Sequence, residues 1–292
     1  MEKKVTVKDV AREAGVSVAT VSYIMNNRTD MKISEDTRKK VLQIANLLNY
    51  KPSSVAKSLA TGRNSMIGLA YHLNPYTPSR NLDLISFSNM LIERLTRLKL
   101  NVMFLPVNDS TVINQNIDGI IALDLCHKDF SYLSDNCFVP IINVDMLIND
   151  NLFYQIYSDI PILLDRVHAY LGNDFYVVLD QYENENYVNY ITQNVPSERI
   201  IFFHPANSNM LENLKGKKVV IIGTYLALMM RAYINDCDMV VISCDENDSL
   251  LPAKIPVLKN DITKKANLTI NILLNALDRK FELKHDHVIA PL

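Results

Sequence analysis

VTVKDVAREAGVSVATVSYIMNN (residues 5–27) predicts two short helices joined by a minimal turn. Thr6 is a good N-cap residue, and Asp9 stands three residues later, where the acid of a capping box lies. The apolar residues of the first helix recur at helical spacing as Val7, Val10, Ala11 and Ala14. Gly15 suits a left-handed helix end, and Ser17 can cap the second helix. The pattern is that of a helix-turn-helix.

The second helix has an apolar face and a small, polar one. The inward residues are Val21, Ile24 and Met25, with Val16 from the turn, and the opposite face carries Val18, Ala19, Ser22, Tyr23 and Asn26. Small side chains at the start of a helix let its backbone approach a surface closely, as a recognition helix in the DNA major groove does. Hydroxyl and amide groups can then bond bases or phosphates. The alternative is a helical hairpin with an ordinary solvent face, which this spacing alone does not exclude.

The longer stretch from residue 5 to residue 62 closely resembles the N-terminus of the lactose-repressor/purine-repressor (LacI/GalR) family of bacterial transcription factors. TVKDVAREAGVSVATVS matches the helix-turn-helix signature, and ISEDTRKKVLQIANLLNYKPSSVAKSLATG matches the third helix and the hinge helix. The resemblance implies a homodimer that binds a pseudo-palindromic operator in double-stranded DNA. It implies DNA contacts from Thr6, Ser17, Val18, Ala19, Thr20, Ser22, Tyr23, Asn26, Lys51, Ser54, Val55, Ala56 and Leu59.

Two departures from the family pattern concern the DNA contacts. Tyr23 stands where family members usually carry an arginine that contacts bases, so the operator sequence cannot be carried over. Pro52-Ser53-Ser54 replaces the usual Pro-Asn of the hinge, but serine also caps helices. Residues 53–60 are too few for a helix stable by itself in water, and we expect them to fold when two copies pair in the minor groove. Leu59 takes the family's wedge position, which kinks the duplex; the alternative is a linker leucine packed on its own domain.

Charge is divided unevenly along the 292 residues, which carry 30 Lys/Arg, 32 Asp/Glu and a net charge of −2. Residues 1–63 hold twelve Lys/Arg and six Asp/Glu, a net charge of +6, which leaves −8 for the remainder. A basic head on an acidic body is typical of a nucleic-acid reader with a regulatory domain. Four cysteines without CxxC spacing indicate a reducing cytoplasm, and no apolar run is long enough to span a bilayer.

From Ser65 onward, apolar runs alternate with helical stretches. The runs are MIGLAYHL, NVMFLPV, GIIALDL, VPIINVD, FYVVLD, RIIFFH, KVVIIGTY and DMVVISCD. Residues 82–98 show the periodicity of an amphipathic helix. Such alternation predicts parallel sheets with helices on both faces.

The resemblance implies a periplasmic-binding-protein-like body of two doubly wound parallel-sheet lobes, so the expected fold class is α plus α/β. We expect a helix-turn-helix head with hinge helix at residues 1–62 and an effector-binding and dimerisation domain at residues 63–292. Lobe 1 is expected at about 63–157 plus part of 256–284, and lobe 2 at about 161–255 plus the C-terminal strand. The chain is expected to cross between them near residues 157–161, 251–259 and 280–285. The body is short for the family, because only NDSTVINQN separates the second strand from Asp118-Gly119.

Ligands of doubly wound lobes bind beyond the carboxyl ends of the strands. Residues at those ends give the candidate effector contacts Tyr71, Asn74, Tyr76, Asp124, Gln181, Thr224 and Asp245. Their aromatic, carboxylate and amide groups could hold a sugar or nucleoside; the alternatives are loop packing and helix capping. Asn74-Pro75-Tyr76 and Asp245 resemble family effector contacts. The family's arginine after FYVVLD has no counterpart in QYENENYVNYITQNV, and Gly223-Thr224-Tyr225 replaces its Asn-Asp pair.

Enzyme signatures are absent from the sequence. It holds no GxGxxG, Walker or GxSxG motif, and seven glycines leave little room for phosphate-binding loops. We therefore predict no catalytic residues, no cofactor and no metal. His285-Asp286-His287 puts two imidazoles on one side of a strand, but two ligands without a third indicate an exposed strand end.

The sequence thus predicts a cytoplasmic, homodimeric, sequence-specific DNA-binding repressor with a small-molecule-sensing body and no membrane partner. One alternative is a DNA-binding dimer whose body has lost effector binding, which the missing arginine and short body favour. Another is a sugar-kinase-like enzyme with a DNA-binding head, which the lack of a phosphate loop disfavours.

Overall fold

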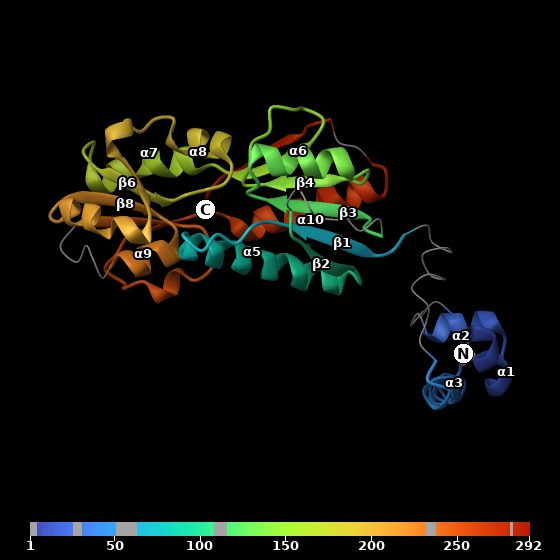
Figure 1. The fold of residues 1–292 in the computed structure, drawn as a ribbon. Helices are drawn as coiled ribbons and strands as arrows, with labels where there is room; N and C mark the ends of the chain where they lie inside the picture. Colours follow the sequence, from blue (N-terminus) through green and yellow to red (C-terminus); the bar gives the residue numbers. More distant parts are fainter. Residues whose placement is uncertain (1–4, 26–30, 51–62, 108–115, 232–237, 281–282) are drawn as a thin grey trace. The chain divides into compact units, whose positions relative to one another are not determined.

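The computed structural model describes residues 5–25, 31–50, 63–107, 116–231, 238–280 and 283–292. The chain divides into two compact units, Met1–Asn64 and Ser65–Leu292, which we call the head and the body (Figure 1). Six of the predicted DNA contacts lie outside the described residues: Asn26, Lys51, Ser54, Val55, Ala56 and Leu59. Nearly all of NDSTVINQN lies outside them too.

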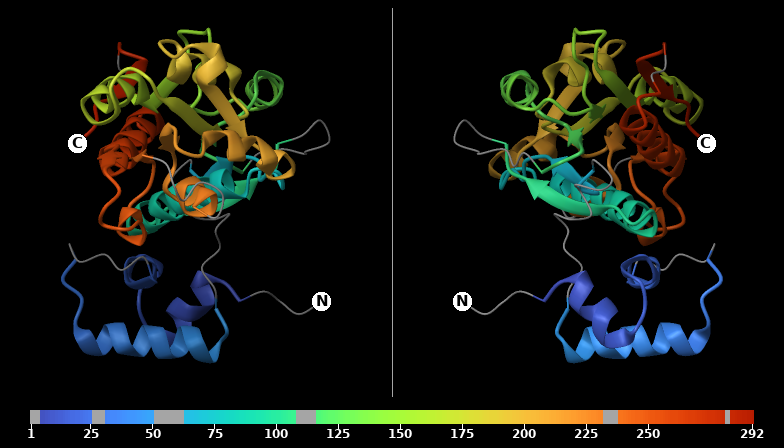
Figure 2. Two further views of the ribbon diagram at one scale, coloured as in Figure 1. Left: turned by 90° about the vertical axis from the view of Figure 1, so that its left-hand side faces the viewer. Right: turned by 90° about the vertical axis from the view of Figure 1, so that its right-hand side faces the viewer.

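The described part of the head consists of three helices, as predicted. They are α1 Val7–Ala14, α2 Val18–Met25 and α3 Glu35–Leu47. Their apolar faces meet in a small core formed by Val10, Ala14, Val21, Ile24 and Val41. Figure 2 shows α3 as the longest of the three, packed against the other two.

Lobe 1 of the body is built on a parallel sheet with the strand order β11-β5-β4-β3-β1-β2. Its strands are β1 Met66–Ala70, β2 Asn101–Leu105, β3 Gly119–Leu123, β4 Ile141–Val144, β5 Tyr154–Ser158 and β11 Asp286–Ile289. Helices α5 Pro78–Arg97 and α10 Ile262–Leu277 cover one face, and α6 His127–Asn136 covers the other (Figure 1).

Lobe 2 has a second parallel sheet with the order β10-β9-β8-β6-β7. Its strands are β6 Tyr176–Asp180, β7 Ile200–Phe203, β8 Lys218–Ile222, β9 Asp238–Ser243 and β10 Val257–Lys259. Helices α7 Ile160–Leu171 and α8 Glu185–Thr192 pack on one face, and α9 Thr224–Met230 with the 3₁₀ segment η2 Pro205–Leu214 packs on the other. Short 3₁₀ turns, η1 Ser197–Arg199 and η3 Asp248–Leu250, precede β7 and β10. None of the described helices of either unit is long and apolar enough to cross a membrane.

All eight apolar runs of the sequence form strands, because strands covered on both faces need continuous apolar residues. The predicted helix at residues 82–98 is confirmed as α5, which begins four residues earlier, at Pro78. Strand β5 was not predicted, because its sequence YQIYS reads as polar. Its five residues are nevertheless buried, and Gln155 is satisfied by donating to Asp286 Oδ1 over 2.9 Å.

The division of the C-terminal third between the lobes differs from the expectation. Strand β10 pairs with β9 in lobe 2, so the chain leaves lobe 2 only after Lys259. Strand β11 pairs with β5 in lobe 1, so the C-terminal strand does not belong to lobe 2 and no crossing precedes it. The expected crossing at residues 280–285 is therefore wrong. The chain returns after β11, where the Leu292 N–H donates to the carbonyl of Lys259 over 3.1 Å.

Candidate functional site

Local capping fixes the helix-turn-helix of the head. The Thr6 N–H and hydroxyl both donate to Asp9 Oδ2, over 2.9 and 2.7 Å, which confirms the capping box. Gly15 has a φ of 68°, the left-handed conformation that glycine adopts without strain, and it ends α1. Ser17 Oγ accepts a bond from the Thr20 N–H over 3.0 Å and so caps α2. These bonds set the angle at which α2 follows α1.

The outward face of α2 carries the predicted base-reading residues that the structure describes. Val21 and Ile24 are buried in the head core, so the other side of α2 faces solvent. Ser17, Val18 and Ala19 are exposed at its N-terminal end, and Thr20, Ser22 and Tyr23 are half-buried further along. Thr6 is exposed at the start of α1. The face is therefore small and hydroxyl-bearing at the end that a major groove would receive.

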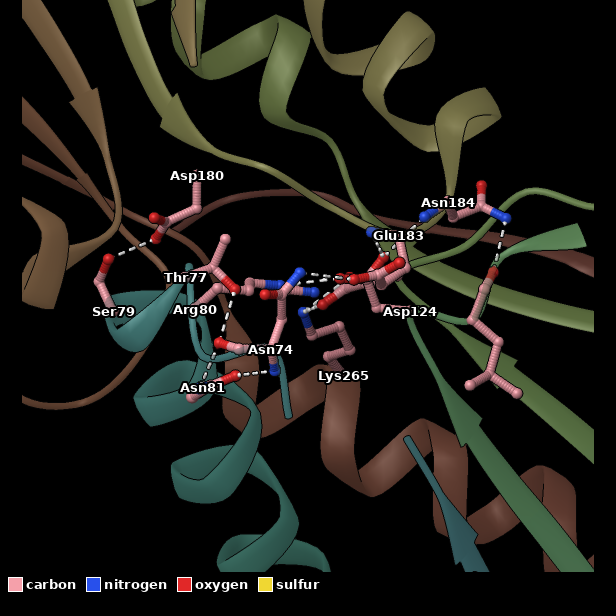
Figure 3. A network of polar contacts seen from close by, with 12 residues as sticks. Asn74, Thr77, Ser79, Arg80, Asn81, Asp124, Asp180, Glu183, Asn184 and Lys265 are labelled. Carbon is pink, nitrogen blue, oxygen red and sulfur yellow. Dashed lines mark hydrogen bonds and ion pairs between the residues drawn. The ribbon is translucent and has the colours of Figure 1, made fainter. Parts of the chain in front are cut away.

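The junction between the lobes of the body is centred on Arg80, in the first turn of α5 (Figure 3). Its Nε donates to Asp124 Oδ2 over 2.9 Å, and both side chains are buried. The guanidinium carbon lies 4.0 Å from the ring centroid of Tyr182, which comes from lobe 2. Arg80 therefore pairs with a lobe 1 carboxylate and stacks on a lobe 2 ring.

Asp124 connects the lobes directly. It follows β3 with a φ of 49°, a left-handed conformation that aspartate tolerates better than most residues. Its Oδ1 accepts bonds from the backbone N–H groups of Glu183 and Asn184 in lobe 2, each over 3.1 Å. Asp145, after β4, has the same conformation, with a φ of 50°.

Further bonds link the same two edges. Asn184 caps α8 and also donates to the Leu125 carbonyl of lobe 1 over 3.1 Å. Ser79 Oγ donates to Asp180 Oδ2 over 2.7 Å, and Asn74 Nδ2 donates to Glu183 Oε1 over 3.1 Å. The lobes are thus joined through their buried centre as well as near the surface.

Lys265 is a second buried cation at the junction. It lies on α10, and its Nζ donates to both oxygens of Asp145, over 2.9 and 2.8 Å, and to Ser158 Oγ over 3.2 Å. The ring centroid of Phe87 is 5.1 Å from the same nitrogen. Buried cations are tolerated when they are paired in this way.

Little free space remains at the centre of the junction, around Arg80. The cavity at the junction has a volume of about 20 Å³ and is lined by Arg80, Asp83, Asp145, Tyr182 and Lys265 among others. Pockets for small molecules usually measure roughly 300–1,000 Å³, whereas a single water needs about 10–15 Å³. The cavity can therefore hold water but not a sugar or nucleoside.

The seven candidate effector residues do not converge on this cavity. Asp124 is engaged as described, and Thr224 donates to Ser243 Oγ over 3.1 Å. Asp245 accepts a bond from the Asn247 N–H over 2.5 Å, a local turn. The other four do not line the cavity either. Tyr71 packs edge-on against Phe104, and Asn74 Oδ1 accepts a hydrogen bond from the Tyr76 N–H. The Tyr76 ring stacks on His204, and Gln181 is exposed. Their effector role stays a prediction.

Sequence reasoning missed Arg80 and Lys265 as junction residues. A usable signal existed for Lys265, because it interrupts the buried face of α10 formed with Ile262, Ala266 and Thr269. The sequence gave no comparable signal for Arg80, apart from its place in the first helical turn after β1. Among the described residues, no group of three or more His, Cys, Asp or Glu side chains could hold a metal ion.

Burial perturbs the acids of the junction. It raises the pKa of Asp124 to about 6, despite the opposing Arg80 guanidinium and the Asn184 N–H. It also raises the pKa of Asp180 to about 6, with Ser79 and Arg80 opposing, and holds the pKa of Asp83 well above its ordinary value. Asp180 Oδ1 and Asp83 Oδ1 have no hydrogen-bond partner among the described residues. Ionisation of these acids therefore works against folding of the body.

Asp180→Asn should stabilise the body at about pH 8 and lose this advantage progressively as the pH falls from about 6 towards 3.8. The folded pKa of Asp180 lies above the ordinary value of 3.8, so the wild type loses stability as the pH rises from 3.8 to about 6, and asparagine does not. The gain is up to about 3 kcal/mol. Urea unfolding at about pH 5 and pH 8 measures it, with the exposed Asp174→Asn as the control. An equal effect at both pH values would contradict the assignment.

Residues 6–53 match a family model described as bacterial regulatory proteins, lacI family. The sucrose operon repressor of Klebsiella pneumoniae is 32% identical over 169 residues, which cover 54% of this chain and 48% of that protein. Catabolite control protein A of Streptococcus mutans is 48% identical over 65 residues, 22% of this chain and 19% of that protein. The chain thus spans about half, or less, of these curated relatives, which are transcription regulators and not enzymes.

Solved structures with the same fold cover the whole chain. The lac repressor dimer bound to operator and the anti-inducer ONPF has a TM-score of 0.72 at 19% identity, covering 99% of this chain and 97% of that one. A complex of the transcriptional regulator CelR with cellobiose has a TM-score of 0.60 at 13% identity, covering 99% and 98%. The predicted architecture of a helix-turn-helix head and a periplasmic-binding-protein-like body is confirmed.

Proposed function

We propose that this chain is a transcriptional repressor which binds a pseudo-palindromic operator as a homodimer. The match of residues 6–53 to the lacI family of bacterial regulatory proteins supports the proposal. The outward face of α2 carries the proposal, because small exposed side chains stand at the end of the helix that would enter the major groove. The basic head supports it, and so does the name of the sucrose operon repressor, a relative. A repressor of this kind works in the cytoplasm, where its operator lies.

Selection from a randomised duplex library should enrich a palindrome, and affinity for it should fall steeply as salt rises. Each phosphate neutralised by a lysine or arginine releases condensed counterions, with a slope of about −0.9 per contact in a log–log plot. Fluorescence anisotropy across a salt series measures this slope, with a scrambled duplex as the control. A library without an enriched palindrome, or a flat salt series, would contradict the proposal.

Tyr23→Arg should change the operator preference at one position of each half-site, towards guanine. Arginine can form a two-pronged contact with guanine worth roughly 1–3 kcal/mol of discrimination, whereas the single hydroxyl of tyrosine cannot. Parallel site selections on the wild type and the variant measure the change. Identical preferences would mean that Tyr23 meets the DNA backbone and reads no base.

The homodimer is supported by an apolar stripe on α5. Leu82, Ile85 and Ile92 share one face of the helix at helical spacing, and each is more than a third exposed. Phe104, half-exposed on the edge strand β2, extends the apolar surface. Such exposed clusters usually mark interaction sites. The solved lac repressor, which has the same fold, is named as a dimer.

Ile85→Asp should weaken the dimer and, through it, the affinity for a two-half-site operator. A charge placed in an apolar interface would be desolvated without a partner, while the isolated body should still fold because Ile85 is 44% exposed. Sedimentation velocity across a concentration series measures the dimer. Ile162→Asp is the matched control, since Ile162 is 41% exposed on α7, away from the stripe. Equal dimerisation of both variants would rule out α5 as the interface.

Two candidates remain for the body. The first is modulation by a small molecule of the sugar or nucleoside class that enters between the lobes, which the name of the CelR–cellobiose complex supports for a protein of this fold. The second is a body that has lost effector binding and serves for dimerisation. The volume of about 20 Å³ at the centre of the junction supports the second candidate. A pocket of about 400 Å³ between α5 and residues 244–247, which include Asp245, supports the first.

A further inference from the structure

The chain's own Arg80 occupies the centre of the junction between the lobes. Its side chain is 6% exposed and reaches the junction from lobe 1, with the Asp124 carboxylate on one side and the Tyr182 ring on the other. Asp124 in turn receives two backbone N–H groups of lobe 2. The junction is thus a continuous chain of contacts from lobe 1 to lobe 2. Lobe 1 supplies the guanidinium and the carboxylate, and lobe 2 supplies the aromatic ring and the two backbone amides.

A ligand closes a two-lobed body when it contacts both lobes at once in the closed state and loses those contacts in the open state. Arg80 meets this description while remaining part of the chain. Its guanidinium donates to the carboxylate that lobe 2 also binds, and its flat face stacks on a lobe 2 ring. It arrives on a helix fixed in lobe 1, so no free ligand has to be captured.

We propose that Arg80 acts as a built-in ligand of the interlobe junction, so that the protein free of small molecules rests in the closed state. The inference rests on the proposed function for its regulatory meaning, since it concerns the body of a repressor. A small molecule that enters the junction must expel Arg80, and it therefore opens the lobes rather than closing them. The group best able to replace Arg80 is another guanidinium or amidinium, because Asp124 and Tyr182 are already arranged for one.

Unmet bonding capacity at Arg80 fits this role. The Nη2 atom of Arg80 is buried and has no hydrogen-bond partner among the described residues. The cavity beside it has room for about one water, which would satisfy such a donor. Departure of the side chain would leave Asp124 with two backbone amides and no cation. The closed junction therefore depends on the guanidinium itself and not merely on apolar packing.

The test is hydrogen exchange of the full-length chain with the Arg80→Ala variant. The amides of Glu183 and Asn184, which donate to Asp124, should exchange about tenfold faster, as expected for loss of a hydrogen-bonded charge. Guanidinium chloride at low millimolar concentration should restore their protection in this variant, and ammonium chloride should not. Arg97→Ala is the matched control, because Arg97 lies on the same helix, is 79% exposed and pairs only weakly with Glu93, 3.7 Å away.

Unchanged exchange at the junction in Arg80→Ala would overturn the proposal. So would faster exchange spread over both lobes that guanidinium does not reverse, because Arg80 would then be a general stabilising residue. A sugar or nucleoside that further protects the wild-type junction would overturn it as well, because ligands would then close the lobes. If Arg80→Ala does not fold, the double variant Arg80→Met/Asp124→Asn should fold, because no buried charge is left unpaired. Its Glu183 and Asn184 amides should exchange faster than in the wild type, and guanidinium should not slow them. Exchange of these amides as slow as in the wild type would overturn the proposal. Operator binding is measured in a separate experiment. Absence of operator binding would refute the repressor function, and the hydrogen-exchange result at the junction would still stand.

Discussion

The body depends on one buried ion pair. The Arg80–Asp124 contact lies where α5, β3 and the start of α8 meet, and both partners are removed from water. Burying charges in this way is unfavourable unless further hydrogen bonds compensate, and here Asp124 also accepts two backbone N–H groups, whereas Arg80 Nη2 has no partner among the described residues. Both partners belong to lobe 1, and lobe 2 binds them through the Glu183 and Asn184 N–H groups and the Tyr182 ring. A shift of lobe 2 would therefore leave the buried carboxylate without two of its donors. Apolar cores stabilise each lobe, whereas these polar contacts to the pair join one lobe to the other.

Two different kinds of contact thus govern the two units. In the head, short-range capping bonds at Thr6 and Ser17 orient α2 so that its small side chains face outward. In the body, contacts between residues far apart in sequence bring the lobes together and leave little free space at the centre of the junction. A protein built in this way can present a DNA-reading surface while its regulatory body stays shut.

The head and most strands could be predicted from the sequence because their signals are local. The Gly15 turn, the Ser17 cap and the apolar spacing of α1 each depend on residues within a few positions of one another. Strands such as β3 and β8 can be recognised in the sequence, because burial on both faces requires an unbroken apolar run. The polar β5 carries no such signal. The C-terminal strand β11 is expected from the sequence, but its sheet is not, because the edge of β5 that it pairs with lies far away in sequence.

The junction could not be predicted, for a physical reason. Arg80 meets Asp124 from 44 positions away, and Lys265 meets Asp145 from 120 positions away. A charged residue looks like a surface residue until its partner is known, since burial becomes tolerable only through pairing. Conversely, Asp124 and Thr224 were predicted as ligand contacts because they end strands, but protein groups already occupy them.

The left-handed backbone at Asp124 and Asp145 limits the evolutionary routes open to this body. Asparagine and glycine share aspartate's tolerance of that conformation, whereas β-branched and bulky residues do not. Exchange of either aspartate for asparagine or glycine would therefore cause no backbone strain. It would nevertheless leave Arg80 or Lys265 without its counter-ion and give the interior an uncompensated positive charge. The same backbone disfavours a direct exchange for a large apolar side chain, so the conformation restricts these positions to a few residue types and the buried cations favour aspartate among them.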